Sequence, residues 1–316
     1  MKYLEYKVGN EDRDKEVLSI LRFKLGLSTK KIRSVKWDPA GILLDGNRVT
    51  VRRRVEKGQT LKVLKSDSEN RAGRILPSPM TLDILYEDED FLFVNKPSGM
   101  VCHPSMGHRQ DSLANGVQAY FEEKEKDSNI HLLGRLDKDT SGILGIAKNG
   151  VMARRMMPGN GIQKEYLAIT EGYLPTEKGT IDIPMEEYRD PSDHLLKMRR
   201  AVSGLHEESL TGREDISGVR KALTFYESVR RRDEYSVCRV RINTGRMHQI
   251  RFHMAQIGHP LLGDSLYGRG PAKNMKRAAL HAHRVEFTHP LSGKKVILEA
   301  EIPEDMSSLL CLPQGN

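Results

Sequence analysis

The chain has 316 residues, of which 38% are hydrophobic and 30% are charged. This composition supports a folded core in one large domain or two smaller ones, and it excludes a wholly disordered chain. Lysine and arginine number 51 against 43 aspartates and glutamates, a formal net charge of +8. The basic residues fall in several short clusters, a distribution typical of a folded surface that follows a phosphate backbone. Aromatic residues make up only 6%, which argues against a platform that stacks several bases.

The cysteine content indicates a reducing compartment. There are three cysteines, an odd number, and none belongs to a CxxC pair. A disulfide framework and a thiolate zinc site are therefore not expected. The sequence shows neither a membrane-spanning apolar run nor a signal peptide at its N-terminus. We expect a cytoplasmic protein without a membrane-bound part.

The first part of the chain, residues 1–65, is expected to form a small module with two helices and a hairpin sheet. Its apolar spacing predicts a helix over residues 14–25 and another over 30–35. The turn Asp45-Gly46-Asn47 predicts a hairpin, and residues 60–63 are expected to add a strand. Its basic residues favour RNA binding, although a capping domain without a ligand fits the same pattern. A polar linker is expected over residues 66–80.

The rest of the chain, residues 81–316, is expected to form a larger domain of the α+β class, because strands outnumber helices and do not alternate with them. A solvated loop is expected over residues 203–218. The expected strands cover residues 91–94, 142–147, 166–170, 236–242 and 296–302, and the expected helices cover 112–121 and 152–157.

A dense polar segment, residues 131–142, lies between two apolar runs, a common setting for a functional site. If it is extended, Asp137 shares a face with Asp139 and with Arg135. We assign Asp139 to a turn, where its side chain bonds the local backbone. Arg135 and Asp137 are left as candidate site residues.

A second polar segment covers residues 244–253. Strand periodicity places Arg251 opposite its apolar neighbours, and a buried arginine needs a carboxylate partner. His248 and His253 are five residues apart, which suits neither a helix face nor a strand face, so no metal site is expected. Tyr166, in the segment Lys164-Glu165-Tyr166, fits an ordinary half-buried position at a strand edge.

Taken together, these segments resemble the RluA family of pseudouridine synthases. The order of the motifs is specific to that family, and the first sixty-odd residues are similar to its S4-type RNA-binding module. The resemblance rests on Asn95-Lys96-Pro97 with His103-Pro104, His131 to Gly142, Lys164 to Ala168, Thr244 to Arg251, Gly258 to Asp264 with Tyr267-Gly268, Leu280 to Ala282 and His289-Pro290.

The resemblance implies a catalytic domain with a bent, mixed and mainly antiparallel sheet that needs no cofactor and no metal. Asp137 matches the catalytic aspartate, which acts either as a nucleophile or as a base. Arg251 matches an arginine that pairs with this aspartate, and Tyr166 a tyrosine that packs on the target base. Arg135 matches a residue that fills the space of the everted uridine.

Further residues are expected to contact RNA. Leu261 and Leu262 are expected to wall the pocket, and the remaining expected contacts are Arg246, His248, Lys31 and Arg53.

The resemblance favours large-subunit ribosomal RNA as the substrate, with transfer RNA as the alternative, and a monomer is expected. A non-catalytic RNA-binding or ribosome-assembly protein, and a carboxylate-dependent nucleoside hydrolase, are the competing hypotheses. Two departures from the family pattern put substrate choice in question: residues 185–189 and the insertion 203–218. Met247 also departs from it and is expected to affect packing only, and the N-terminal module departs from the S4 pattern around Trp37 to Gly41.

Overall fold

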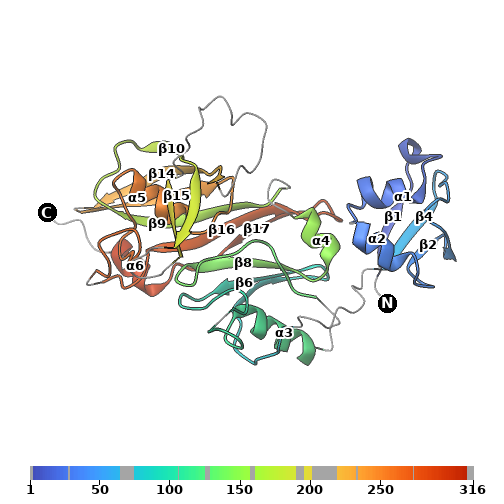
Figure 1. The fold of residues 1–316 in the computed structure, drawn as a ribbon, viewed down its shortest axis with the longest axis horizontal. Helices are drawn as coiled ribbons and strands as arrows, with labels where there is room; N and C mark the ends of the chain where they lie inside the picture. The colour runs from blue at the N-terminus through green and yellow to red at the C-terminus, as the bar shows by residue number, and fades with distance from the viewer. Residues whose placement is uncertain are drawn as a thin grey trace.

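The computed structural model describes residues 3–27, 29–64, 75–105, 107–124, 129–156, 161–189, 196–200, 219–232, 234–272 and 274–311. Figure 1 shows a small N-terminal unit beside a larger body that is built around a long sheet. Within these ranges, no helix is long and apolar enough to cross a membrane.

The N-terminal unit contains a four-stranded sheet in the order β1-β4-β2-β3. Asp45 and Gly46 connect β2 to β3, and both have positive φ angles, of 50° and 82°. This backbone matches the type I′ turn that the sequence predicted for the hairpin. The strand β1 was not predicted. The strands are β1 (Tyr3–Lys7), β2 (Ile42–Leu44), β3 (Asn47–Arg48) and β4 (Thr60–Leu64).

The first predicted helix is shorter and more irregular than its apolar spacing suggested. Asp14 has a φ of 64°, so the chain turns before the helix begins. Helix α1 covers only Val17–Ser19 and continues as a π-helical segment, Ile20–Lys24. A short 3-10 helix at Asn10–Asp12 precedes them. The second helix, α2 (Thr29–Val35), agrees with the prediction.

The larger body contains a ten-stranded sheet, whose main path is β10-β14-β15-β9-β16-β8-β6-β5, with β17 on β16 and β7 on β8. The β8–β16 pair is parallel and the other described pairs are antiparallel, which confirms the mixed, mainly antiparallel α+β prediction. The strands are β5 (Ile84–Glu87), β6 (Phe91–Lys96), β7 (His131–Leu132), β8 (Ser141–Ala147), β9 (Gln163–Glu171), β10 (Lys178–Asp182), β14 (Leu223–Arg232), β15 (Tyr235–Ile242), β16 (Leu280–Thr288) and β17 (Lys295–Glu299).

A further three-stranded sheet has the order β12-β11-β13, with β11 (Met185–Arg189), β12 (Leu196–Arg200) and β13 (Val219–Arg220). The predicted loop at 203–218 lies outside the described residues. The departure noted at 185–189 corresponds to strand β11 of this sheet.

Helices flank the large sheet. Ser112 caps α3 (Leu113–Glu123) through a reciprocal capping box with Asn115, as expected for a serine at this position. The remaining helices are α4 (Gly150–Arg155), α5 (Gln249–Gln256) and α6 (Glu304–Cys311).

Helix α5 corrects one prediction, because strand periodicity was expected around Arg251 and the segment is helical. The apolar residues Ile250, Phe252 and Met254 are all buried, and so are Arg251 and His253. A helix that is buried on nearly every side carries no clear amphipathic stripe, which explains why the sequence pattern was misread.

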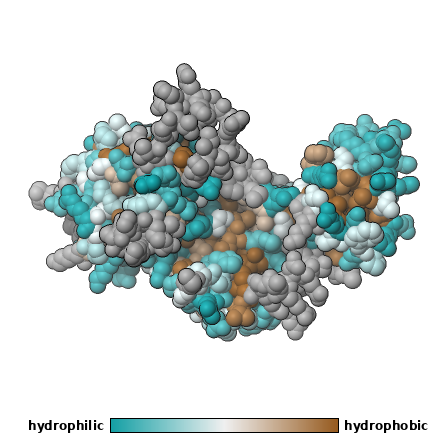
Figure 2. All heavy atoms as spheres, in the orientation of Figure 1, coloured by the Kyte–Doolittle hydropathy of each residue, from teal (hydrophilic) through white to brown (hydrophobic). Residues whose placement is uncertain are grey.

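Two large apolar clusters hold the fold together. One joins the N-terminal unit to β6, α4 and β16, and the other contains Tyr166, Leu136, Ile250 and Leu261. Figure 2 shows hydrophobic residues on the visible face over β6 and β8. Arg155 adds a polar link, because its guanidinium donates to the carbonyl of Lys24 at 2.7 Å.

The linker was predicted at residues 66–80, and residues 66–74 of it lie outside the described residues. Residues 75–80 have no regular secondary structure. The boundaries of the two predicted domains stay a prediction.

Candidate active site

The loop between β7 and β8 carries Asp137. The peptide N–H of Thr140 donates to the carbonyl of Asp137 at 3.1 Å, which closes a turn around Asp139. The extended segment that would place Asp137 and Asp139 on one face is therefore wrong, and a turn is observed at Asp139. The expected bond from the Asp139 side chain to the local backbone stays a prediction. The Asp137 side chain is 14% exposed, so its carboxylate is recessed but open to solvent.

A buried ammonium fixes the middle of this loop. Lys96 is fully buried at the end of β6, and its Nζ donates to the carbonyls of Pro97, Met100 and Lys138 at 2.8, 2.8 and 3.1 Å. Burial lowers the pKa of Lys96 to about 8. The Asn95-Lys96-Pro97 motif was assigned only to turn chemistry, and the structure shows that Lys96 anchors the residue after Asp137.

Two more cations hold the ends of the same loop. Lys164 donates to the carbonyl of Leu133 at 2.6 Å, and burial lowers its pKa to about 8. Arg277 donates to the carbonyl of Asp139 at 3.0 Å, while Asp305 holds its guanidinium at 2.7 Å. The loop backbone is thus fixed on both sides of Asp137 by charge-assisted hydrogen bonds.

His248 lies close to Asp137 and interacts with it electrostatically. Its Nε2 lies 4.0 Å from Oδ1 of Asp137, close enough for electrostatic interaction but too far for a hydrogen bond. His248 precedes α5 with a φ of 52°, a strained conformation for a residue that is not glycine. Its Nδ1 lies 3.0 Å from the hydroxyl of Tyr267.

Tyr267 links this histidine to β12. The peptide N–H of Met198 donates to the Tyr267 oxygen at 2.8 Å. The tyrosine oxygen accepts this bond, so its own proton is free to donate to Nδ1 of His248. Burial raises the pKa of Tyr267 to about 12 and lowers that of His248. Both effects favour a neutral histidine that carries its proton on Nε2, the atom facing Asp137.

The carboxylate partner of Arg251 is Asp264, which corrects the expected pair with Asp137. Arg251 donates through Nε and Nη2 to the two oxygens of Asp264, each at 2.7 Å. Both side chains are buried, and Asp264 also accepts the N–H groups of Leu266 and Tyr267. These bonds hold the pKa of Asp264 below its usual range despite burial. Asp137 still contributes to the raised pKa of Arg251, so the two charges interact without contact.

Tyr166 lies on β9 in the same region. It is 5% exposed and packs in the apolar cluster that contains Leu136 and Leu261. Burial raises the pKa of its hydroxyl, and the negative charge of Asp137 adds to this effect. The hydroxyl is therefore protonated at neutral pH and lies within the electrostatic range of Asp137.

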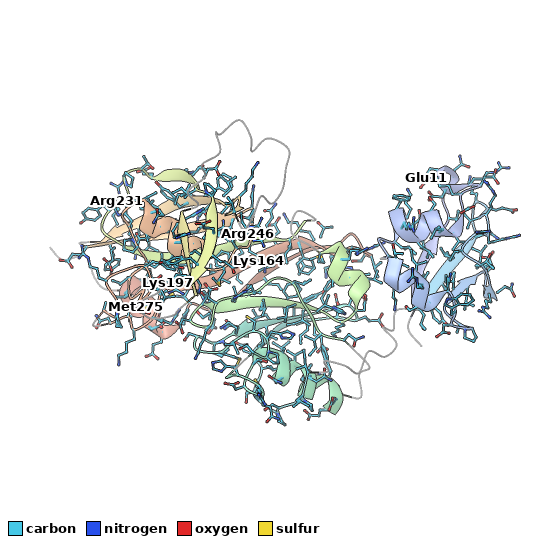
Figure 3. The ribbon with its side chains drawn as sticks, in the orientation of Figure 1. Glu11, Lys164, Lys197, Arg231, Arg246 and Met275 are labelled. Carbon is cyan, nitrogen blue, oxygen red and sulfur yellow. The ribbon has the colours of Figure 1, made fainter. Side chains whose placement is uncertain are left out.

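The other predicted RNA contacts lie either in the larger body or in the N-terminal unit. Four of them belong to the larger body. Leu261 belongs to the apolar cluster that contains Tyr166, whereas Leu262 packs against the cluster that contains Met275. The pocket wall expected from both leucines stays a prediction. Arg135 is exposed on the loop that carries Asp137 and acts electrostatically on His248. Arg246 precedes α5 and donates to the carbonyl of Lys221 at 3.3 Å (Figure 3).

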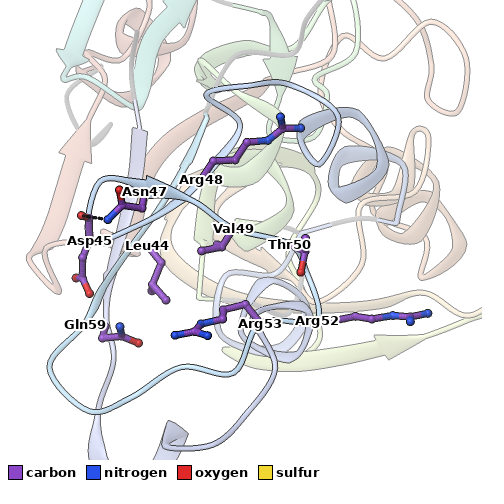
Figure 4. Close-up of a pocket in the computed structure, with 9 residues that line it drawn as sticks. All are labelled: Leu44, Asp45, Asn47, Arg48, Val49, Thr50, Arg52, Arg53 and Gln59. Atoms are coloured by element: carbon purple, nitrogen blue, oxygen red, sulfur yellow. Dashed lines mark hydrogen bonds between the residues drawn. The ribbon is translucent and has the colours of Figure 1, made fainter.

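Two predicted contacts belong to the N-terminal unit. Lys31 is only 9% exposed and has a partner, so the structure does not present it as an open phosphate contact. Arg53 is exposed at a cavity of about 520 Å³ that Arg48 and Arg52 also line. In Figure 4 the Arg53 side chain extends toward Gln59, whereas Arg52 extends away from it.

The described residues contain no group of three or more His, Cys, Asp and Glu side chains that would hold a metal ion. Sequence reasoning had not given roles to Lys96, Asp264 or Tyr267. Each lay within a motif that was already noted, at Asn95 to Pro97 or at Gly258 to Gly268. The available signal was a charged residue within a turn motif, as at Lys96 and Asp264.

Comparisons with known proteins define the class. Residues 90–256 match the family model of RNA pseudouridylate synthases. The structure is similar to human RNA pseudouridylate synthase domain containing 4, with a TM-score of 0.54 and 21% identity over 72% of this chain and 91% of that one. This likeness supports the fold.

Two relatives with similar sequences show which family the chain belongs to. The chain is 32% identical to the uncharacterized RNA pseudouridine synthase YjbO of Bacillus subtilis, over 91% of this chain and 95% of the relative. It is 34% identical to the ribosomal large subunit pseudouridine synthase D of Zymomonas mobilis, over 74% of this chain and 73% of the relative. The chain belongs to the RluA-type RNA pseudouridine synthases, enzymes that isomerise uridine in RNA.

Proposed function

We propose that Asp137 is the catalytic carboxylate of this synthase and that its target uridines lie in large-subunit ribosomal RNA. The observation that carries the first part is the recessed, partly exposed Asp137 carboxylate on a loop that buried Lys96 and Arg277 hold in place. A fixed loop presents a reactive group in one geometry, which lowers the entropic cost of reaching the transition state.

Pseudouridine formation breaks the bond between C1′ of the ribose and N1 of the base, and the base rejoins the sugar through C5. Asp137 acts in this reaction as a nucleophile or as a base, and both routes require its ionised form. Arg251 supplies positive charge nearby while Asp264 holds its guanidinium in place. Tyr166 provides a ring beside the carboxylate on which the uracil packs.

We assign a positioning role to His248. A neutral imidazole with its proton on Nε2 presents a donor toward Asp137, at 4.0 Å in the absence of RNA. Such distances often shorten when substrate binds. The Tyr267 hydroxyl fixes this tautomer, so the relay from Met198 through Tyr267 to His248 orients the donor.

The target nucleotide must leave its helix to reach a recessed carboxylate. Arg135 is exposed two residues before Asp137, a place from which its side chain can occupy the vacated space. Exposed arginines at the cavity of the N-terminal unit, Arg48 and Arg53 among them, are suited to hold phosphates at a distance from the reaction.

The ribosomal assignment is supported by the relatives that are named large-subunit synthases, such as that of Zymomonas mobilis. Pseudouridine mapping of total RNA tests it in cells that carry wild type, Asp137→Asn or the control Asp139→Asn. Asp139 lies two residues away on the same turn. We expect Asp137→Asn to remove pseudouridine from the positions in large-subunit RNA that this enzyme modifies in wild type, and Asp139→Asn to keep it there. A loss confined to transfer RNA would contradict the ribosomal assignment, and no loss would contradict the role of Asp137.

A further inference from the structure

The only tryptophan of the chain, Trp37, lies on the surface of the N-terminal unit. Its side chain is 72% exposed, just after helix α2. The ammonium of Lys36 lies 4.7 Å from the centroid of the indole ring. An isolated exposed hydrophobic residue is ordinary, so exposure alone does not define a site. The fixed backbone around Trp37 and the charges beside it indicate that the ring is suited to bind a ligand.

The backbone on either side of Trp37 is fixed. Lys36 donates its N–H to the carbonyl of Ile32 at 3.0 Å, and Asp38 donates to that of Val35 at 3.2 Å. Gly41 has no room for a side chain, because a Cβ there would lie 1.9 Å from the Val35 oxygen. The indole therefore projects from a rigid turn, and a ligand that stacks on it orders little additional chain.

Two exposed cations share the surface with the ring. Arg33 lies three residues before Lys36 and four before Trp37, and both cations are exposed. Residues three and four apart are neighbours on a helix surface, and the hydrogen bond from Lys36 to Ile32 continues the helical geometry to this point. The surface thus combines a flat aromatic face with two positive charges.

We propose that Trp37, Arg33 and Lys36 form a single-nucleotide site, in which one unpaired base of the RNA stacks on the indole and its neighbouring phosphates pair with the two cations. An aromatic ring beside cations is a common arrangement for binding single-stranded nucleic acid. Bases within a duplex already stack on each other, so the site selects an unpaired nucleotide. This inference rests on RNA being the substrate but does not depend on Asp137 or on which RNA is modified.

Fluorescence excited at the long-wavelength edge, where tyrosine does not absorb, tests the proposal directly, because Trp37 is the only tryptophan of the chain. The full chain is titrated with a short single-stranded oligouridylate and with an RNA duplex of the same length. Labelled-RNA anisotropy measures binding in parallel. We expect the single strand to quench the emission as it binds and the duplex to change it little. Binding of the single strand without any change in emission would overturn the proposal.

Substitutions give a second test. Trp37→Leu keeps an apolar side chain but removes the stacking surface, and we expect it to weaken single-strand affinity about 5- to 150-fold. Trp37→Phe should fall between Trp37→Leu and wild type. Lys36→Gln should weaken affinity and lessen its dependence on salt. The control is Leu291→Ala, because Leu291 is 42% exposed and lies on a different turn.

Enzyme kinetics separates this proposal from the proposed function. Trp37→Leu should raise KM for RNA and leave kcat unchanged, because the ring lies outside the catalytic loop. Unchanged affinity in a Trp37→Leu variant of an active enzyme would refute the nucleotide site and leave the role of Asp137 intact. Quenching by RNA together with full activity of Asp137→Asn would support the nucleotide site and refute the catalytic assignment.

Discussion

We predict how far the free energy of unfolding falls when the buried pair between Arg251 and Asp264 is broken. Arg251→Met leaves an unpaired buried carboxylate, and Asp264→Leu leaves an unpaired buried guanidinium. Both side chains are almost fully buried and their two hydrogen bonds are each 2.7 Å long. Removing one member of such a pair costs about 3–5 kcal/mol of unfolding free energy. The double variant removes both charges and should cost much less than the sum of the two single changes.

Urea unfolding of wild type, the two single variants and the double variant measures this coupling. The control is Lys62→Met, because Lys62 pairs with Glu5 at 2.6 Å while the two side chains are 37% and 55% exposed. An exposed pair of this kind contributes at most about 1 kcal/mol. Each single variant at the buried pair should be several times more destabilised than this control.

Activity then separates the two roles of Arg251. The double variant should recover stability but stay inactive, because the positive charge near Asp137 is missing. Recovery of turnover together with stability would show that Arg251 serves the fold alone. Single variants that cost less than the Lys62→Met control would refute the buried pair itself.

Three further predictions concern the same site. Tyr267→Phe removes the donor to His248, so kcat should fall about 5- to 150-fold, from about 1–3 kcal/mol for the lost bonds, while RNA affinity stays unchanged in an anisotropy assay. Lys96 has a pKa of about 8 in the fold against 10.5 in the unfolded chain, so the unfolded chain binds more protons between these values and stability rises with pH. In Lys96→Met, chemical unfolding across this window should show a slope lower by up to about 1.4 kcal/mol per pH unit. Gly142→Ala should lower the melting temperature, because a Cβ there would lie 2.3 Å from the Ala282 oxygen, whereas Gly46→Ala meets no neighbour and should matter less.

Five strands of the large sheet, β6, β8, β9, β15 and β17, were predicted because their signal is local, whereas β5, β7, β10, β14 and β16 were missed. Residues 91–94 and 142–147 are continuous apolar runs, and both lie within buried strands. The Asp45-Gly46 turn was predictable for the same reason, since two residues set its backbone. Helix α5 was missed because burial on nearly all sides removes the periodicity that identifies a helix.

The site was only partly predictable. The motif gave Asp137 as the candidate carboxylate, and the need for a carboxylate beside Arg251 followed from the cost of burying a lone charge. The choice of partner depended on a contact across 13 residues, from Arg251 to Asp264, that no local pattern encodes. The bond from Lys96 to Lys138 spans 42 residues and was equally invisible. Contacts of this kind arise from the tertiary fold, in which segments distant in sequence come together.

Release of tritium from RNA labelled at C5 of uridine is the most direct test of the role of Asp137. Forming the new bond at C5 expels the label, so the release reports the reaction itself. Purified Asp137→Asn should bind RNA like wild type and release no tritium above background, while Asp139→Asn should release it at close to the wild-type rate. Release by Asp137→Asn at the wild-type rate would contradict the central claim.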